Sequence, residues 1–242
     1  MEQAEYLDAM VTTGLYPRPN NLRFFLEQIF HDLEFENRRV LDIGGGSGFL
    51  SFFAASRGAS EVICLEPELD GSTAGASHRF NSIVERHDFG ACRLVPQTFQ
   101  DYCLGQPGLF DIVILHASIN HLDEDACIRL RVSPDARRAY QRIFSDIAAM
   151  SAPGARIVMT DVSPLNFFPA MRVQNPFARS IEWHKHQTPE TWIELLREAG
   201  YSDAETEWLT FNTLRGVGKF FLGNKCASYF LTSDFVLRMK KP

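Results

Sequence analysis

The stretch Val40-Leu41-Asp42-Ile43-Gly44-Gly45-Gly46-Ser47-Gly48-Phe49-Leu50 decides the fold of this chain. Its apolar beginning predicts a buried β-strand, and its glycines predict a turn that leads directly into a helix beginning near Ser47. Glycine at the alternate positions 44, 46 and 48 permits positive φ angles and removes the Cβ atoms that would keep a ligand away. Free N–H groups at the start of the helix would point at that ligand. The turn therefore predicts a cradle for a cofactor.

Apolar strands alternate with helices on both sides of this turn. Upstream, the spacing of Leu22, Phe25, Leu26 and Ile29 predicts a helix that Asn20 or Asn21 caps. Downstream, strands are expected at 61–66, 92–95, 110–115 and 155–161, and helices at 47–57, at 73–87, from Ser133-Pro134 and from Thr188-Pro189. Strands that are apolar throughout and separated by helices predict a parallel sheet covered on both faces.

The C-terminal part of the chain breaks this alternation. Strands are expected at 205–211 and 227–237, and only a glycine-bearing loop, 215–225, separates them, which predicts an antiparallel pair. The fold expected is α/β: a Rossmann-like doubly wound sheet of about seven strands, mostly parallel, with a C-terminal antiparallel hairpin. We expect one domain over 1–242, with an N-terminal helical extension at 1–36 and an irregular insertion at 162–187.

Composition narrows the possible partners and compartments. A formal charge of −6 and a pI near 5.7 argue against attraction to nucleic acid or anionic membrane, although they leave room for a local basic patch. No apolar run approaches the roughly 20 residues of a membrane span, and the N-terminus does not resemble a signal peptide. The five cysteines include no C-x-x-C pair, so the cytoplasm is the expected compartment.

Two common glycine-loop patterns fail at this turn. A dinucleotide-binding G-x-G-x-x-G counted from Gly44 meets Phe49 at its sixth position, which disfavours a nicotinamide-dependent oxidoreductase. A phosphate loop needs a Lys that is absent here, and the look-alike at 216–220 is interpreted as a flexible turn. Glu66, however, ends the next strand, 22 positions after Gly44. A carboxylate there can accept hydrogen bonds from both hydroxyls of a ribose, so a nucleoside without pyrophosphate fits best.

Asp42, the G-x-G-x-G run and Glu66 together resemble the class I S-adenosylmethionine-dependent methyltransferases. The resemblance covers roughly 36–165 motif by motif and 188–239 by the order of elements. It implies S-adenosyl-L-methionine as cofactor and S-adenosyl-L-homocysteine as product. The family pattern implies that Asp42, Gly44, Gly45 and Gly46 line the methionine part of the cofactor and that Glu66 binds the ribose. Asp42 could instead only cap the turn.

The same resemblance implies two further contacts. Residues after the third strand usually contact adenine, which points to Thr98 and Phe99; many members have Asp where this chain has Thr98 or Gln97. The tip of the fourth strand should face the reactive methyl group, which points to His116 and Ala117. His116 could also pack against the cofactor without taking part in chemistry.

The acceptor side is less well specified. Methyl transfer needs the acceptor held in line about 3 Å from the methyl carbon, and a protonated acceptor needs a base. His121 is the first choice for that base, followed by His184 and His186. The insertion at 162–187 is expected on the acceptor side, where its aromatic residues either line a pocket or form a small satellite core: Phe167, Phe168, Phe177 and Trp183.

These observations predict a methyltransferase that acts on an oxygen or nitrogen of a small-molecule acceptor. The alternative is a non-catalytic cofactor-binding or scaffolding protein of the same fold. No metal is expected, because no ligand set has convincing spacing. Nucleic acid and membrane are not expected partners, and the assembly expected is a monomer or a homodimer.

Overall fold

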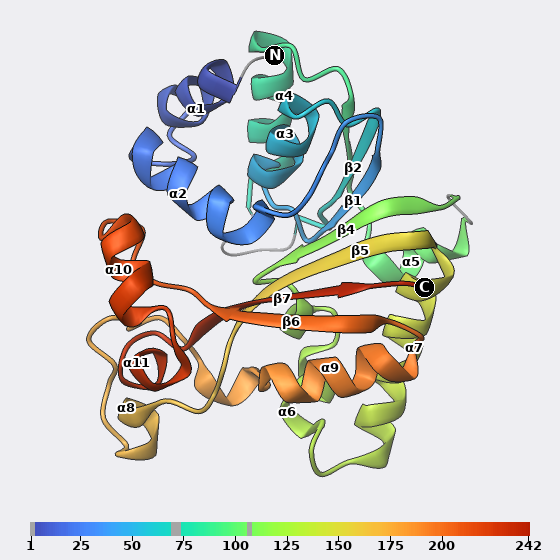
Figure 1. The fold of residues 1–242 in the computed structure, drawn as a ribbon. Helices are drawn as coiled ribbons and strands as arrows, with labels where there is room; N and C mark the ends of the chain where they lie inside the picture. Colours follow the sequence, from blue (N-terminus) through green and yellow to red (C-terminus); the bar gives the residue numbers. More distant parts are fainter. Residues whose placement is uncertain (1–2, 69–73, 106–107) are drawn as a thin grey trace.

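The computed structural model describes residues 3–68, 74–105 and 108–242. Seven strands form one sheet in the order β3-β2-β1-β4-β5-β7-β6 (Figure 1). Strands β1 to β5 are parallel, and β7 is antiparallel to both of its neighbours, β5 and β6. This confirms the predicted mixed sheet with an antiparallel C-terminal pair. The strands span Arg39–Ile43 (β1), Glu61–Leu65 (β2), Cys92–Val95 (β3), Phe110–His116 (β4), Ser151–Val162 (β5), Ser202–Trp208 (β6) and Asp234–Lys240 (β7).

Helices cover both faces of the sheet (Figure 1). One core cluster packs beneath α1 (Gln3–Thr12), α2 (Pro19–Phe30), α3 (Phe49–Ser56) and α4 (Ala76–Arg86). The other packs beneath α5 (Phe99–Leu104), α6 (Glu124–Arg129), α7 (Pro134–Ala149) and α9 (Pro189–Glu198). Successive strand residues alternate between the two cores, as Val40 and Leu41 do. Within the described ranges, no helix has the length and apolar character that crossing a membrane requires.

Two helix starts follow local sequence signals. Ser133 caps α7, accepting a hydrogen bond from the Ala136 N–H, with Pro134 at the first helical position. Thr188 caps α9 in the same way through the Thr191 N–H. The face of α7 predicted to be apolar is buried at Ala136, Tyr140, Ile143, Phe144 and Ile147.

Other element boundaries differ from the predictions. Helix α2 is not capped by Asn20 or Asn21, because it begins at Pro19, whose ring fixes a helical φ one residue earlier. Helix α3 begins at Phe49 and not Ser47, since Gly48 precedes it with φ +85°. Strand β5 starts at Ser151, because the Pro153-Gly154 pair is accommodated as an irregularity in the pairing with β4. Of the helix predicted at 73–87, Thr73 lies outside the described residues.

The loop predicted at 215–225 is wrong, and so is the strand predicted from 227. Helix α10 (Arg215–Leu222) and helix α11 (Lys225–Phe230) stand between the last two strands. The glycines at 216, 218 and 223 predicted a loop because glycine disfavours helices. Contacts of α10 with α2 and α11 override that preference, and Gly218 is buried. The remaining short helices are η1 (Ile119–His121), α8 (Phe167–Ala170) and η2 (Trp183–Lys185).

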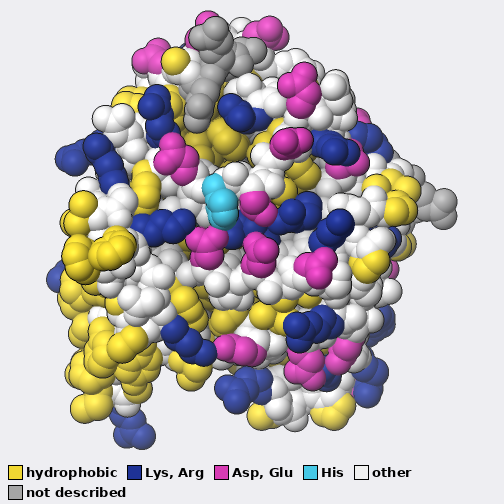
Figure 2. Space-filling view, viewed as in Figure 1, with side chains coloured by type: hydrophobic (Ala, Val, Ile, Leu, Met, Phe, Trp, Pro, Cys, Tyr) yellow, Lys and Arg dark blue, Asp and Glu magenta, His cyan; other side chains and the backbone are white. Residues whose placement is uncertain are grey.

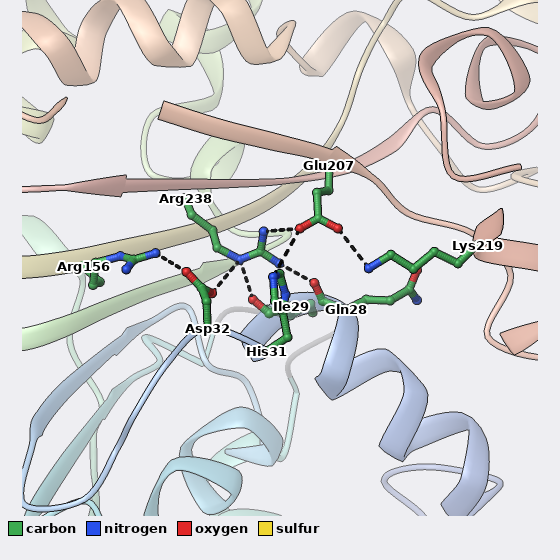
Figure 3. Close-up of polar contacts among 8 residues, drawn as sticks. All are labelled: Gln28, Ile29, His31, Asp32, Arg156, Glu207, Lys219 and Arg238. Atoms are coloured by element: carbon green, nitrogen blue, oxygen red, sulfur yellow. Dashed lines mark hydrogen bonds and ion pairs between the residues drawn. The ribbon is translucent and has the colours of Figure 1, made fainter. Parts of the chain in front are cut away.

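A buried arginine joins the end of α2 to the C-terminal strands (Figure 3). Arg238 on β7 has no exposed surface and donates to the Ile29 carbonyl at 2.9 Å and to Glu207 on β6 at 2.8 Å. Its Nε also lies 3.3 Å from Asp32, which pairs with Arg156 on β5. The end of α2 is therefore fixed to the sheet by charged contacts as well as apolar packing.

Candidate functional site

The glycine turn is fastened to the neighbouring strand. The N–H groups of Gly44 and Gly45 donate to the Leu65 carbonyl at 2.8 and 3.1 Å. Gly46 has φ +56°, and a Cβ atom on it would meet nothing within 4 Å. The turn thus presents open backbone at Gly46, the position where a ligand can approach most closely.

Gly44 and Gly45, the other two predicted turn glycines, are required by close packing within the chain. A Cβ atom on Gly44 would lie 2.5 Å from the Cβ of Ser118 at the tip of β4, and one on Gly45 would lie 2.6 Å from the Cys64 sulfur. Both contacts are too short for any side chain. Close approach of neighbouring strand tips therefore explains these two glycines without a ligand.

Asp42 lies beneath the turn and does not line the cavity described below. Its side chain is buried, and its Oδ2 accepts a hydrogen bond from Ser51 at 2.7 Å. Burial raises the pKa of Asp42 to about 6, against the lowering effect of the Ser51 hydrogen bond. Its Oδ1 has no hydrogen-bond donor among the described residues. An acceptor left in this state is costly unless a further donor reaches it.

Glu66 lies directly after β2 with its carboxylate buried but bordering a cavity. Its Oε2 accepts from the Gly46 N–H at 2.9 Å and its Oε1 from the Glu68 N–H at 3.0 Å. The first of these bonds links the acid directly to the glycine turn. A carboxylate oxygen can accept more than one hydrogen bond, so Glu66 keeps capacity for a ligand.

The cavity has a volume of about 490 Å³ and lies at the carboxyl ends of the strands. Six residues predicted for the site line it: Gly44, Glu66, Thr98, Phe99, Ala117 and His121. The remaining lining residues are Ile43, Leu65, Pro67, Gln97, Gln100, Ser118, Leu122 and Glu124. Ligands of open α/β sheets bind at this edge, beside the point where the strand order reverses. In this sheet that point lies between β1 and β4.

The wall beyond β3 is built by an unforeseen helix. Thr98 caps α5, accepting from the Asp101 N–H at 3.1 Å while its hydroxyl donates to the Asp101 carboxylate at 2.7 Å. The Thr98 side chain is therefore engaged in the cap. Gln97 and Gln100 supply amide groups on either side of it, and Gln100 also donates to the Leu122 carbonyl at 2.6 Å. The spacing of Thr98 and Asp101 is a capping signal that could have revealed α5.

His116 lies beside the cavity and not in its lining. Its Nδ1 is 2.5 Å from the Thr160 hydroxyl, and its ring packs edge-on against Phe25 and Phe49 at 5.4 and 6.0 Å. This apolar packing lowers the pKa of His116 to about 4 through desolvation. The imidazole is consequently neutral at pH 7.

Of the histidines predicted as candidate bases, His121 contacts an acidic residue that also pairs with the segment carrying the other two. His121 on η1 is exposed in the cavity wall, and its Nδ1 lies 3.3 Å from Glu124. The other oxygen of Glu124 lies 2.9 Å from the Lys185 amine on η2. This link brings the segment that carries His184 and His186 next to η1, although His184 itself points into solvent.

His186 has the most constrained position of the three. Its Nδ1 lies 2.7 Å from Oδ1 of Asp161 on β5, and the other oxygen of Asp161 accepts from the Trp192 indole N–H at 3.0 Å. Asp161 is buried. A carboxylate at Nδ1 favours the tautomer in which Nε2 is free to accept a proton.

Comparison with known proteins shows the family to which the chain belongs. The sequence profile of the methyltransferase domain family matches residues 18–206. The chain belongs to this methyltransferase family. Membership confirms the predicted family and, with it, a methyl-transferring enzyme that uses S-adenosyl-L-methionine as its cofactor.

Individual relatives of this methyltransferase are distant. A ubiquinone biosynthesis O-methyltransferase of Neisseria meningitidis is 22% identical over 189 residues, which cover 78% of this chain and 74% of that protein. Two solved structures share the fold at a TM-score of 0.57, both S-adenosylmethionine-dependent methyltransferases. The one from Archaeoglobus fulgidus is 17% identical and covers 92% of this chain and 94% of its own. The one from Mesorhizobium loti is 15% identical, with 86% and 93% covered.

Proposed function

We propose that this methyltransferase transfers the methyl group to an oxygen or nitrogen atom of a small-molecule acceptor. The observation that carries the proposal is the cavity in which Glu66 and Gly44 border the same space as His121. Its volume of about 490 Å³ lies within the range of roughly 300–1,000 Å³ that small-molecule sites have. The name of the Neisseria meningitidis relative supports oxygen as the accepting atom.

The cavity residues fit the cofactor. In this proposal Glu66 accepts hydrogen bonds from the ribose hydroxyls, Thr98 and Phe99 border the adenine, and Ala117 borders the opposite wall. The open backbone at Gly46, beside Gly44 and Gly45, receives the methionine portion. The unpartnered Oδ1 of buried Asp42 suits an ammonium donor.

The bound cofactor supplies a methyl group made electrophilic by the adjoining sulfonium. The protein must hold the acceptor in line, about 3 Å from the carbon attacked, and remove its proton. We assign proton removal to His186, which lies outside the cavity lining, because Asp161 orients its ring and leaves Nε2 able to accept. His121, at the cavity wall, is the second candidate, and His184 is the third because no partner fixes it among the described residues.

The domain organisation also belongs to this proposal. One domain spans 1–242, in which the N-terminal extension 1–36 contributes Phe25 beside His116 and the insertion 162–187 contributes His186 beside Asp161. Both segments therefore reach the carboxyl edge of the sheet, where the acceptor is expected. A cytoplasmic location and a monomeric or homodimeric assembly stay predictions.

Replacement of Glu66 by Ala tests the cofactor assignment. The affinity for S-adenosylhomocysteine, measured by titration calorimetry, should fall at least tenfold, which corresponds to about 1.4 kcal/mol from lost charged hydrogen bonds. Glu85→Ala, an exposed change on α4, is the matched control and should leave the affinity unchanged. Equal affinity for the wild type and Glu66→Ala would contradict the assignment.

Product formation separates the enzyme from its alternative. A panel of hydroxylated and amine-bearing small molecules, followed by mass spectrometry for a methyl adduct, should yield at least one product. Cofactor binding without product across the panel would favour the non-catalytic or scaffolding protein. Activity that disappears on treatment with a chelator and returns with a divalent metal would contradict the prediction that no metal takes part.

A further inference from the structure

Hydrophobic side chains gather on the surface formed by α8, α10 and α11 (Figures 1 and 2), and no described residue of these helices lines the cavity. We call residues 165–177 and 214–230 the apolar surface. Its side chains are exposed to a degree unusual for their size: Phe220 82%, Val217 70%, Phe221 67%, Met171 60%, Val173 53%, Phe177 52% and Phe230 48%. A continuous patch of this kind marks an interaction site on a folded protein.

The apolar surface is built with its polar groups inside. Asn166 and Asn175 are each 1% exposed, and both donate to the Leu231 carbonyl, at 3.0 and 2.6 Å. Asn166 also donates to the Ser233 hydroxyl at 2.9 Å. These buried amides fix the two halves of the surface to each other.

Ring contacts cross between the same two halves. Phe167 lies 5.4 Å from Phe230, and Phe177 lies 5.7 Å from Phe211, which precedes the second half. On α10 the exposed rings of Phe220 and Phe221 contact each other at 4.9 Å, while Gly218 faces inward. The exposed rings are therefore held in position by the buried residues beneath them.

The segments that contain and flank the apolar surface carry a net positive charge, opposite in sign to the net charge of the whole chain. The segments 162–181 and 208–233 contain no Asp or Glu and carry five basic residues, in a protein of net charge −6: Arg172, Arg179, Arg215, Lys219 and Lys225. Lys219 pairs with Glu207 at 3.0 Å and Lys225 with Glu190 at 2.8 Å. The three arginines are exposed, and no ion pair joins them to another described residue. The overall charge thus conceals a locally basic patch.

We propose that the apolar surface docks on the surface of an anionic lipid bilayer. Exposed Phe rings beside basic groups are the combination that lies at the boundary between headgroups and acyl chains. The arginines would meet lipid phosphates, which accept hydrogen bonds from guanidinium groups. A second copy of the chain fits less well, because a two-fold interface would place the same five cations against each other. The inference does not depend on the acceptor or on catalysis.

Vesicle binding tests the proposal. The full chain should sediment with phosphatidylcholine vesicles that contain phosphatidylglycerol, bind at least tenfold less to phosphatidylcholine alone, and be released as salt is raised. The double change Phe220→Ser and Phe221→Ser should lower binding at least tenfold. The triple change Arg172→Gln, Arg179→Gln and Arg215→Gln should remove the preference for phosphatidylglycerol.

Controls keep the outcome unambiguous. Val132→Ser and Arg131→Gln alter an equally exposed apolar residue and an exposed arginine elsewhere, and should leave vesicle binding unchanged. Each variant should keep the wild-type affinity for S-adenosylhomocysteine, which shows that it is folded. Vesicle binding that the Phe variants do not alter would overturn the proposal. Failure of the full chain to bind vesicles would also overturn it if sedimentation velocity showed another assembly that depends on the same rings. That assembly would be a dimer, or a complex with an acidic protein, that the Phe220→Ser and Phe221→Ser double change dissociates.

Discussion

The buried carboxylate of Asp42 connects the stability of the fold with pH. Asp42 is shielded from water beneath the glycine turn, with one oxygen bound to Ser51 and the other without a donor among the described residues. Its pKa is raised from 3.8 to about 6, mainly by desolvation. The folded protein therefore binds a proton at Asp42 more tightly than the unfolded chain does.

Asp42 should make the protein less stable as pH rises. Because the folded pKa is the higher one, the destabilising contribution is absent below pH 4, grows between pH 4 and 6, and is complete above, where it amounts to about 3 kcal/mol. Asp42→Asn should remove this part of the pH dependence. Urea unfolding at pH 5 and pH 7.5 gives the free energy of unfolding of the variant and of the wild type, and the difference between the two proteins should change with pH. Parallel curves for the two proteins would show that the carboxylate is not strained by burial.

At the scale of elements, three separate segments build the most constrained histidine. Strand β5 supplies Asp161, α9 supplies Trp192, and the residue after η2 is His186. Asp161 holds both partners at once, one on each oxygen. The short helix η2 is further tied to α6 by the pair of Lys185 and Glu124. These contacts position the imidazole at the end of β5.

His186→Asn tests the proposed base with an acceptor that the panel identifies. The maximal rate should fall about 10²- to 10⁴-fold, the usual contribution of a general base, while the affinity for S-adenosylhomocysteine stays unchanged. His78→Asn, an exposed change on α4, should leave both the rate and the affinity intact. A comparable loss from His121→Asn with no effect of His186→Asn would transfer the role to His121.

At the scale of the whole molecule, Arg238 connects parts of the chain that lie far apart in sequence (Figure 3). It bonds to the end of α2 and to β6 from a position with no exposed surface. Burial would raise the pKa of Glu207, but hydrogen bonds and charge from Lys219 and Arg238 lower it overall. The pairs of Glu207 therefore stabilise the fold above its unfolded pKa, and that stability is lost as pH falls through the folded pKa.

Arg238→Met should destabilise the protein strongly. The change keeps most of the side-chain volume but takes from Glu207 its buried partner and leaves two backbone carbonyls of α2 without this donor, which costs about 3–5 kcal/mol. Urea or thermal unfolding followed by circular dichroism measures the loss. Arg131→Met, at an exposed arginine, is the control and should shift the midpoint little. A variant as stable as the wild type would show that apolar packing alone holds α2 in place.

Local signals predicted much of the fold, and several candidate site residues named from them border one cavity. Ser133 with Pro134, and Thr188 with Pro189, marked helix starts correctly because a capping bond spans only three residues. Gly44, Glu66, Thr98 and Ala117 border one cavity, as expected from the meeting of parallel strands at one edge. Helix α10 was missed because its glycines argue locally for a loop, while its contacts with α2 come from far along the chain.

The sequence by itself determined the strand, the glycine turn and the acid after the next strand, because each depends on residues that are neighbours along the chain. Those features are also the ones by which the chain resembles the class I S-adenosylmethionine-dependent methyltransferases. Only the tertiary structure decided that Ser118 and Cys64 require Gly44 and Gly45, that Asp161 holds His186, and that Arg238 anchors α2. The physical reason is that these contacts join residues far apart in sequence, and no local pattern records which side chains folding brings within a few ångströms of each other.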